Sequence, residues 1–552
     1  MKRLQKKSFH NEVSITIFHL MALINKNLRM RTVYLYLMAI LLVAAGGCNK
    51  ILDTTPQDFI SPVNYYNSEK ELESALAGVY DRLGDNRMYS QGMACYLVFS
   101  DEFFMKNQTS GINANIIDAS TLEVNRHWES IYVGIERANM LLENINKPKD
   151  ISEQRRNEIK GQTLFLRAYY YFMLVDEFGA VPLKLQSTKS PDEPPLPATP
   201  IARIYEQITK DMKEAEGLVR TISDYNYNTR ITKTAVQGIL ARVYLTMAGA
   251  PLNDVSKYAE ARKYADDVIQ SGIHKLNLDF KQIYINHVQE AFDIGEGIWE
   301  VEFKGANKNE IQEGGMIGSY NGITCGNIDT GYGYDYVHAT AKLYNAYEQG
   351  DLRRDWTVAP FRFVTTGKTV VRTAWTADQL YERSNGKWRR EYELLLPRDQ
   401  SYTSTNWPLL RYADVLLMFA EADNEVNNGP SQQAYMAINM VRRRGYGKDV
   451  GAADPAIDAP AGLAKQDFQD LIMSERLREL AFEGLRKHDL IRWGIYPSTM
   501  QAQIREYQSN MPAALRDPAI AQAQRITERS VLFPIPNSEL AVNPNIQQNP
   551  GW

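Results

Sequence analysis

Apolar residues recur every three to four positions through most of this chain, which is the spacing of one face of an α-helix. The pattern is clear in residues 128–142 and again in residues 152–178, where large apolar side chains share one helical stripe. Ser68 and Glu71 have the spacing of a capping box and predict a helix that extends to about Leu83. The hydrophobic pattern therefore predicts a mainly all-α protein.

Two pairs of shorter helices are predicted within this pattern. They are residues 231–251 with 255–272, and residues 411–427 with 430–445. Ala and Tyr at the expected contacts resemble those of tetratricopeptide units, which stack to bury a face that one hairpin cannot bury. We expect such hairpins mainly within 68–272 and 409–444, unevenly spaced rather than as a simple solenoid. Thr199 and Pro200 predict a further helix start, with an N-cap threonine and a first-turn proline.

The pattern changes between about residues 290 and 405. Residues 297–303 alternate as a β-strand does, with Ile298 and two glutamates opposite Trp299 and two other apolar residues. Residues 314–338 interleave Gly, Asn and Tyr without a helical period, which indicates a loop. Loops held on a rigid scaffold often carry binding groups, so we expect the ligand site of this protein in a loop-rich region with short strands.

The N-terminal segment has the features of an export signal. Residues 33–47 are uncharged, follow a basic stretch and change from leucines to glycines toward their end. Met30 could be the true start of translation, which would give a signal of normal length. The run is too short to span a bilayer, and it resembles a bacterial lipobox because Cys48 follows the small residues directly. We predict a signal peptide over 1–47, a lipid on Cys48 and a tether over 48–67, before a single domain over 68–552. The alternative is a plain secretory signal with a chance cysteine.

Composition and charge narrow the possible functions. The net charge is −4, from 62 basic and 66 acidic residues, and this balance gives no reason to expect a nucleic-acid partner. Three cysteines and seven scattered histidines make a structural zinc site unexpected, and we predict neither a metal nor another cofactor. At most Cys95 and Cys325 could form a disulfide.

Three C-terminal stretches resemble the closing signatures of the SusD/RagB family: "PLLRYADVLLMFAEADNE" (408–425), "ERLRELAFEGLRKHDLIRWG" (475–494) and "VLFPIPNSELAVNPNIQQNPGW" (531–552). The resemblance extends over essentially all of 48–552. It implies a helical, tetratricopeptide-like fold and a lipid-anchored protein on the surface of the outer membrane. It also implies a partner, a SusC-like TonB-dependent β-barrel transporter, to which a captured glycan or peptide is delivered. The resemblance supplies no catalytic residues.

The charged signature helix raises the question of catalysis. Glu475, Glu479 and Glu483 lie four residues apart, and a glycosidase would use two such carboxylates as acid and base. The many nearby arginines favour a structural ion-pair network, because they would lower the pKa values of these carboxylates. A general acid needs a raised pKa instead. We therefore predict no enzyme, and we expect His488 to be packed or capping. Arg411 and Asp414 are predicted to form a local ion pair.

The ligand site should be aromatic, because the apolar faces of sugar rings stack on Tyr and Trp while polar side chains bind the hydroxyls. The candidates are Tyr320, Asn321, Tyr332, Tyr334 and Tyr336 in the Gly-rich loop, and Asn86, Arg87 and Tyr89 after the first helix. The alternative is that these residues pack the loops or contact the barrel. Trp299 is expected in the core and Trp552 against the body, or as a ligand platform. Trp375 and Trp388 stay undecided.

The prediction for function is therefore a cell-surface lipoprotein that binds a nutrient, first of all an oligosaccharide, and passes it to the transporter. Three alternatives stay open. The nutrient could be a peptide, or the protein could be an assembly partner of the transporter that binds no ligand. A lipoprotein glycosidase on a helical scaffold is the least favoured.

Overall fold

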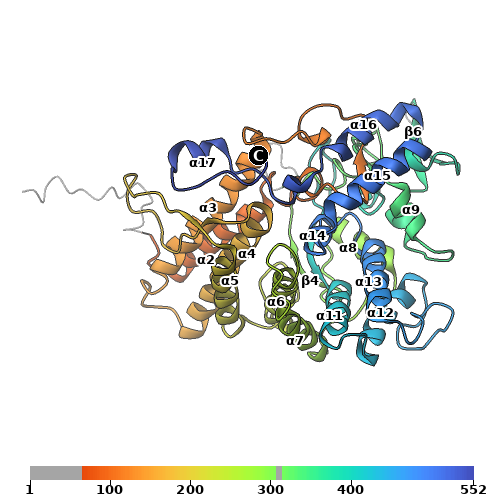
Figure 1. Cartoon of the computed structure of the whole chain (residues 1–552). Coiled ribbons are helices and arrows are strands. Elements are labelled where there is room, and N and C mark those ends of the chain that lie inside the picture. Colours follow the sequence, from red (N-terminus) through yellow and green to blue (C-terminus); the bar gives the residue numbers. More distant parts are fainter. Residues whose placement is uncertain (1–64, 306–313, 368) are drawn as a thin grey trace, which may run out of the picture. The chain divides into compact units, whose positions relative to one another are not determined.

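The computed structural model describes residues 65–305, 314–367 and 369–552, so the predicted signal, Cys48 and most of the tether lie outside the described residues. Residues 66–552 form one compact unit, built mainly from helices (Figure 1). Its first long helices are α2 (Glu69–Tyr80), α3 (Leu122–Asn144), α4 (Glu153–Phe178) and α5 (Ile201–Glu216). The capping box at Ser68 is confirmed, and α2 stops at Tyr80, where a 3₁₀ turn over Asp81–Gly84 continues the chain.

The two predicted helical pairs are confirmed, and they stack on one another. They are α6 (Lys233–Ala248) with α7 (Lys257–Gln270), and α11 (Tyr412–Val426) with α12 (Gln432–Gly445). Helix α7 packs against both α6 and α11, so two segments far apart in sequence form one helical layer. Figure 1 shows this layer extended by α13 (Lys465–Leu480), which contacts α11. The mainly α-helical, tetratricopeptide-like fold is therefore confirmed.

The remaining helices are shorter or lie near the C-terminus. They are α8 (Phe280–Val288), α9 (Ala341–Ala346), α10 (Arg354–Thr357), α14 (Arg486–Arg492), α15 (Tyr496–Asn510), α16 (Ala513–Gln524) and α17 (Asn537–Val542). The C-terminal residue packs on the body as predicted, because Trp552 Nε1 donates to the carbonyl oxygen of Leu532 at 2.9 Å. The Arg529 guanidinium lies 4.2 Å from the centre of the Trp552 ring. None of the helices in the described ranges has the length and apolarity that crossing a bilayer requires.

Short antiparallel strand pairs hold the loop-rich region together. They are β1 (Phe103–Met105) with β5 (Val337–Ala339), β2 (Val181–Pro182) with β3 (Ala198–Thr199), β4 (Gly297–Val301) with β8 (Trp407–Arg411), and β6 (Phe361–Thr366) with β7 (Thr369–Ala374). Strand β8 runs directly into α11, so β4 is anchored to the helical layer. The pairing of β1 with β5 places the loops of residues 100–120 and 314–340 next to each other.

The structure confirms the predicted strand and corrects two other details. Strand β4 is buried along its whole length, and its Glu300 pairs internally with His287 at 2.8 Å. Pro200 rather than Thr199 is the N-cap residue of α5, so this helix begins one residue later than predicted, at Ile201. Arg411 does not pair with Asp414; its partners are glutamates that are distant in sequence, described below.

The tryptophans and cysteines mostly belong to the interior. Trp299 is in the core as predicted, and Trp388 is fully buried. Trp375 is half-buried, with the Arg362 guanidinium 4.7 Å from the centre of its ring. Cys95 and Cys325 are both buried and free, so the two do not form a disulfide.

Candidate ligand-binding site

Four of the predicted tyrosines lie together and form what we call the tyrosine platform: Tyr320, Tyr332, Tyr334 and Tyr336. The last three alternate along the segment that leads into β5. The ring centres of Tyr334 and Tyr336 are 5.7 Å apart with an angle of 8° between the planes. Those of Tyr320 and Tyr336 are 4.6 Å apart. All four residues are half-buried.

Asp335 fixes the platform from behind. It lies between two platform tyrosines with φ +65°, a left-handed conformation that is uncommon for residues other than glycine. Its carboxylate accepts hydrogen bonds from His338 Nε2 at 2.8 Å, from Lys106 Nζ at 3.0 Å and from Ser384 Oγ at 3.0 Å. Burial alone would raise the pKa of Asp335, but His338 and Lys106 hold it at about 2. The carboxylate therefore stays charged and clamps the backbone that carries the rings.

Polar groups at the edge of the platform come from two other loops. Asn113 Nδ2 donates to the hydroxyl oxygen of Tyr320 at 3.2 Å, and the hydroxyls of Tyr334 and Ser401 are 2.8 Å apart. Burial raises the pKa of Tyr320 to about 12, so its hydroxyl stays neutral and able to donate. Sequence reasoning missed Asn113, whose only signal was its place in a polar loop. Aromatic faces with amide and hydroxyl groups beside them can bind the faces and the hydroxyls of a sugar ring.

Two predicted residues are enclosed by the protein. Asn321 is 1% exposed and bridges two loops, accepting from Gly318 N at 2.8 Å and donating to Ala94 O at 3.1 Å. Tyr89 is 7% exposed, and its hydroxyl oxygen lies 2.5 Å from that of Tyr169. Neither side chain therefore forms a ligand-binding surface, and Asn321 holds in place the loop that carries Tyr320.

Asn86 and Arg87 do not join the platform. They line a separate cavity of about 630 Å³, together with charged residues such as Arg230 and Glu302, and this lining includes none of the four platform tyrosines. The loop that carries Asn86 and Arg87 nevertheless contacts the loop that leads to Tyr320, because Met316 N donates to Ser90 O at 2.9 Å. The structure thus brings one predicted set together and places the other beside it.

The glutamates of the signature helix form a buried ion-pair network, as predicted. Glu475 pairs with Arg353 at 2.6 Å, Glu479 with Arg444 at 2.6 Å, and Glu483 with Lys387 at 2.6 Å. Arg411 joins the network through Glu296 at 2.7 Å, Glu479 at 3.0 Å and Glu483 at 2.8 Å. Burial would raise the pKa of Glu475, Glu479 and Glu483, but the surrounding cations lower it in all three. Carboxylates held ionised in this way are unsuited to general acid catalysis.

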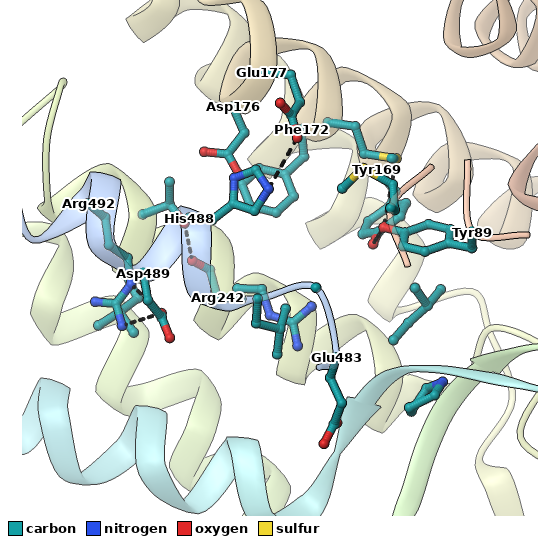
Figure 2. A pocket seen from close by; sticks show the side chains of 18 of the residues that line it. Tyr89, Tyr169, Phe172, Asp176, Glu177, Arg242, Glu483, His488, Asp489 and Arg492 are labelled. Atoms are coloured by element: carbon teal, nitrogen blue, oxygen red, sulfur yellow. Dashed lines mark hydrogen bonds and ion pairs between the residues drawn. The ribbon is translucent and has the colours of Figure 1, made fainter. Parts of the chain in front are cut away.

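His488 is also packed rather than poised as a base. It borders a cavity of about 70 Å³ and points toward Asp176 and Glu177 on α4, at 2.8 and 3.1 Å (Figure 2). Burial alone would lower the pKa of His488, but the two carboxylates raise it to about 10. The imidazole is therefore protonated at neutral pH and serves as the centre of a buried ion cluster, which confirms the sequence prediction.

This cluster predicts a pH dependence of stability. The pKa of His488 is about 10 in the folded protein and about 6.5 in an unfolded chain, so its contribution is complete below pH 6.5 and disappears as the pH rises toward 10. We expect His488→Gln to lower the unfolding free energy more at pH 6 than at pH 10. Urea unfolding of both proteins across this range measures the difference between them. An equal loss at both pH values would contradict the ion cluster.

Comparison with known proteins identifies the family of this chain. A family model described as the SusD family matches residues 295–552, and one described as starch-binding associating with outer membrane matches residues 50–245. The crystal structure of a SusD homologue from Bacteroides thetaiotaomicron is 30% identical, with a TM-score of 0.82 and coverage of 89% of this chain and 98% of that chain. The chain belongs to the SusD family.

More distant members of the SusD family match over similar lengths. SusD-like protein P2 of Formosa agariphila is 24% identical over 525 residues, which are 93% of this chain and 98% of that protein. The structure of surface glycan-binding protein A from Bacteroides fluxus is 22% identical, with a TM-score of 0.68 and coverage of 88% of this chain and 100% of that chain. At that identity the second match supports the shared SusD fold alone.

Proposed function

We propose that this SusD-family protein binds an oligosaccharide nutrient on the tyrosine platform. The observation that carries the proposal is the clustering of Tyr320, Tyr332, Tyr334 and Tyr336, whose neighbouring ring centres lie 4.6 to 6.1 Å apart. Sugar rings present apolar C–H faces to such rings, while Asn113 and Ser401 offer hydrogen bonds to their hydroxyls. The name of the related glycan-binding protein from Bacteroides fluxus is consistent with this ligand class.

The protein would work at the cell surface beside a transporter. The name of the second family model, which refers to starch binding and the outer membrane, supports association with that membrane. A lipid on Cys48 would anchor the chain there, and several acyl chains would make the attachment stable. A SusC-like TonB-dependent β-barrel would then receive the bound nutrient. In this role the protein performs no chemistry on its ligand.

A binding screen tests the proposal against its alternatives. Isothermal titration with a panel of neutral and acidic oligosaccharides, and with a peptide digest, should give saturable binding to at least one glycan. Binding to peptides alone would favour the peptide alternative. Co-purification with a β-barrel but no ligand would favour an assembly partner, and release of shortened glycan products would favour a glycosidase.

The proposed anchor has its own test. Cys48→Ala removes the only thiol at the end of the signal segment, so the exported protein should be unlipidated and should move entirely from the membrane to the soluble fraction. Fractionation should use cells that lack the proposed barrel partner, so that contacts with that protein cannot hold the variant in the membrane fraction. Cys95→Ala, a buried cysteine in the folded unit, is the matched control and should stay with the membrane. A Cys48→Ala protein that remains membrane-bound in these cells would contradict lipidation.

A further inference from the structure

A pocket beside the tyrosine platform has the chemistry of an anion site. It has a volume of about 210 Å³, far more than the roughly 10–15 Å³ that one water requires. Its wall includes five aromatic residues: Tyr96, Phe99, Tyr496, Phe533 and Trp552. Three cationic residues also line it: Lys487, Arg525 and Arg529. Aromatic walls with cations suit a ligand group that combines an apolar ring face with a negative charge.

The two arginines differ from those of the buried network. Lys487 is neutralised internally, because its Nζ lies 2.9 Å from Glu177 Oε2. One nitrogen of Arg525 donates to the carbonyl oxygen of Ala114 at 2.5 Å. One nitrogen of Arg529 donates to the carbonyl oxygen of Gly551 at 3.3 Å. Within the described part of the chain neither arginine forms an ion pair with a carboxylate. Each guanidinium therefore keeps N–H donors available for an external anion.

The pocket and the platform are joined by one short segment. Asn113 donates to Tyr320 of the platform, Ala114 accepts from Arg525, and Asn115 lines the pocket. Two residues of extended chain span at most about 7 Å, so the two surfaces lie within reach of a single short oligosaccharide. The protein as a whole is slightly acidic, with a net charge of −4, so this local excess of cations is a feature of the site and not of the overall composition.

We propose that the pocket is an anion subsite and that the preferred ligand is an acidic glycan. This inference rests on the proposed function and names its substrate class. One sugar unit would place a carboxylate or a sulfate ester against Arg525 and Arg529, while its neighbours stack on the tyrosine platform. Bidentate contacts from arginine to such anions are the strong class of hydrogen bond, so the pocket discriminates acidic chains from neutral ones.

The experiment compares three probes of equal length by isothermal titration: a uronate oligosaccharide, a sulfated oligosaccharide and a neutral glucan. We expect at least one acidic probe to bind about tenfold more tightly than the neutral one at 0.1 M salt, with the advantage shrinking at 0.5 M salt. Arg525→Gln should lose about that tenfold for the acidic probe and leave the neutral probe unchanged. The uronate and sulfated arms identify which anion the pocket takes.

Two variants separate binding from structure. Arg505→Gln on α15 is the matched control, because Arg505 is exposed, lies outside the pocket lining and changes the net charge equally. Arg525→Lys keeps the charge but loses the planar fork, so it should recover part of the acidic binding. Equal affinity for acidic and neutral probes, or equal losses in Arg525→Gln and Arg505→Gln, would contradict the anion subsite. The proposed function would still hold in that case if the neutral glucan binds to the platform. If no glycan binds, the proposed function itself fails.

Discussion

Replacing Arg411 by methionine should destabilise the folded protein by roughly 3–5 kcal/mol, the usual cost of breaking a buried ion pair by removing one partner. Arg411 is 1% exposed and its guanidinium contacts Glu296, Glu479 and Glu483. Methionine fills much of the same space, so the loss would come mainly from carboxylates left buried with too few cations. Urea unfolding followed by circular dichroism measures the change in unfolding free energy.

A surface ion pair supplies the control for this prediction. Lys263 and Asp267 are 2.7 Å apart on α7, and their side chains are 59% and 35% exposed. Lys263→Met should therefore cost only about 0–1 kcal/mol, since solvent screens such pairs. If Arg411→Met were as mild as Lys263→Met, the network would not be a main source of stability. Adding Glu479→Gln to Arg411→Met should recover part of the loss, because it removes one of the unpaired charges.

The double substitution of Tyr334 and Tyr336 by alanine should weaken glycan binding by about 10- to 100-fold, because each stacked ring contributes roughly 0.5–1.5 kcal/mol beyond its buried area. The two rings are half-buried, and Asp335 holds the backbone between them through its own contacts. The fold should therefore survive the change. Isothermal titration with the best glycan from the screen measures the affinity, and thermal unfolding checks the fold.

The chain offers a close structural match as a control. Tyr225 and Tyr227 are also two residues apart, with ring centres 5.5 Å from each other and Asn226 between them at φ +60°. Alanine at both positions removes the same amount of aromatic surface away from the platform. Binding should be unchanged in this variant. Equal losses in the two double variants would show that the tyrosine platform is not the glycan site.

Most helices could be predicted because their signals are local. The helix over residues 152–178 and the capping box at Ser68 depend only on neighbours within one or two turns, and both are confirmed. The single apolar stripe expected for that helix is wrong, because α4 is buried on all sides from Gly161 to Val175. The alternation of tyrosines at 332, 334 and 336 was likewise visible, and their neighbouring ring centres lie 5.0 and 5.7 Å apart. These features need no information about the rest of the chain.

The errors arise where a partner lies far away in sequence. Arg411 meets Glu479 and Glu483 across 68 and 72 residues, and Glu296 across 115, so its nearest acidic neighbour was the wrong choice. Glu300 is buried beside His287 and the amide of Asn406, and the latter lies 106 residues away in the sequence. Asn113 reaches Tyr320 across 207 residues, and nothing near it in sequence marks it as part of the site.

The clamp at Asp335 has a consequence for how ligand would arrive and leave. With its carboxylate bonded to His338, Lys106 and Ser384, the platform rings are set in place before any sugar touches them. Little conformational entropy is then lost on binding, so a few stacking contacts suffice for useful affinity. Association needs no slow rearrangement, and release breaks only weak contacts. A surface with these kinetics would exchange its ligand quickly, as the proposed delivery of a nutrient to a transporter requires.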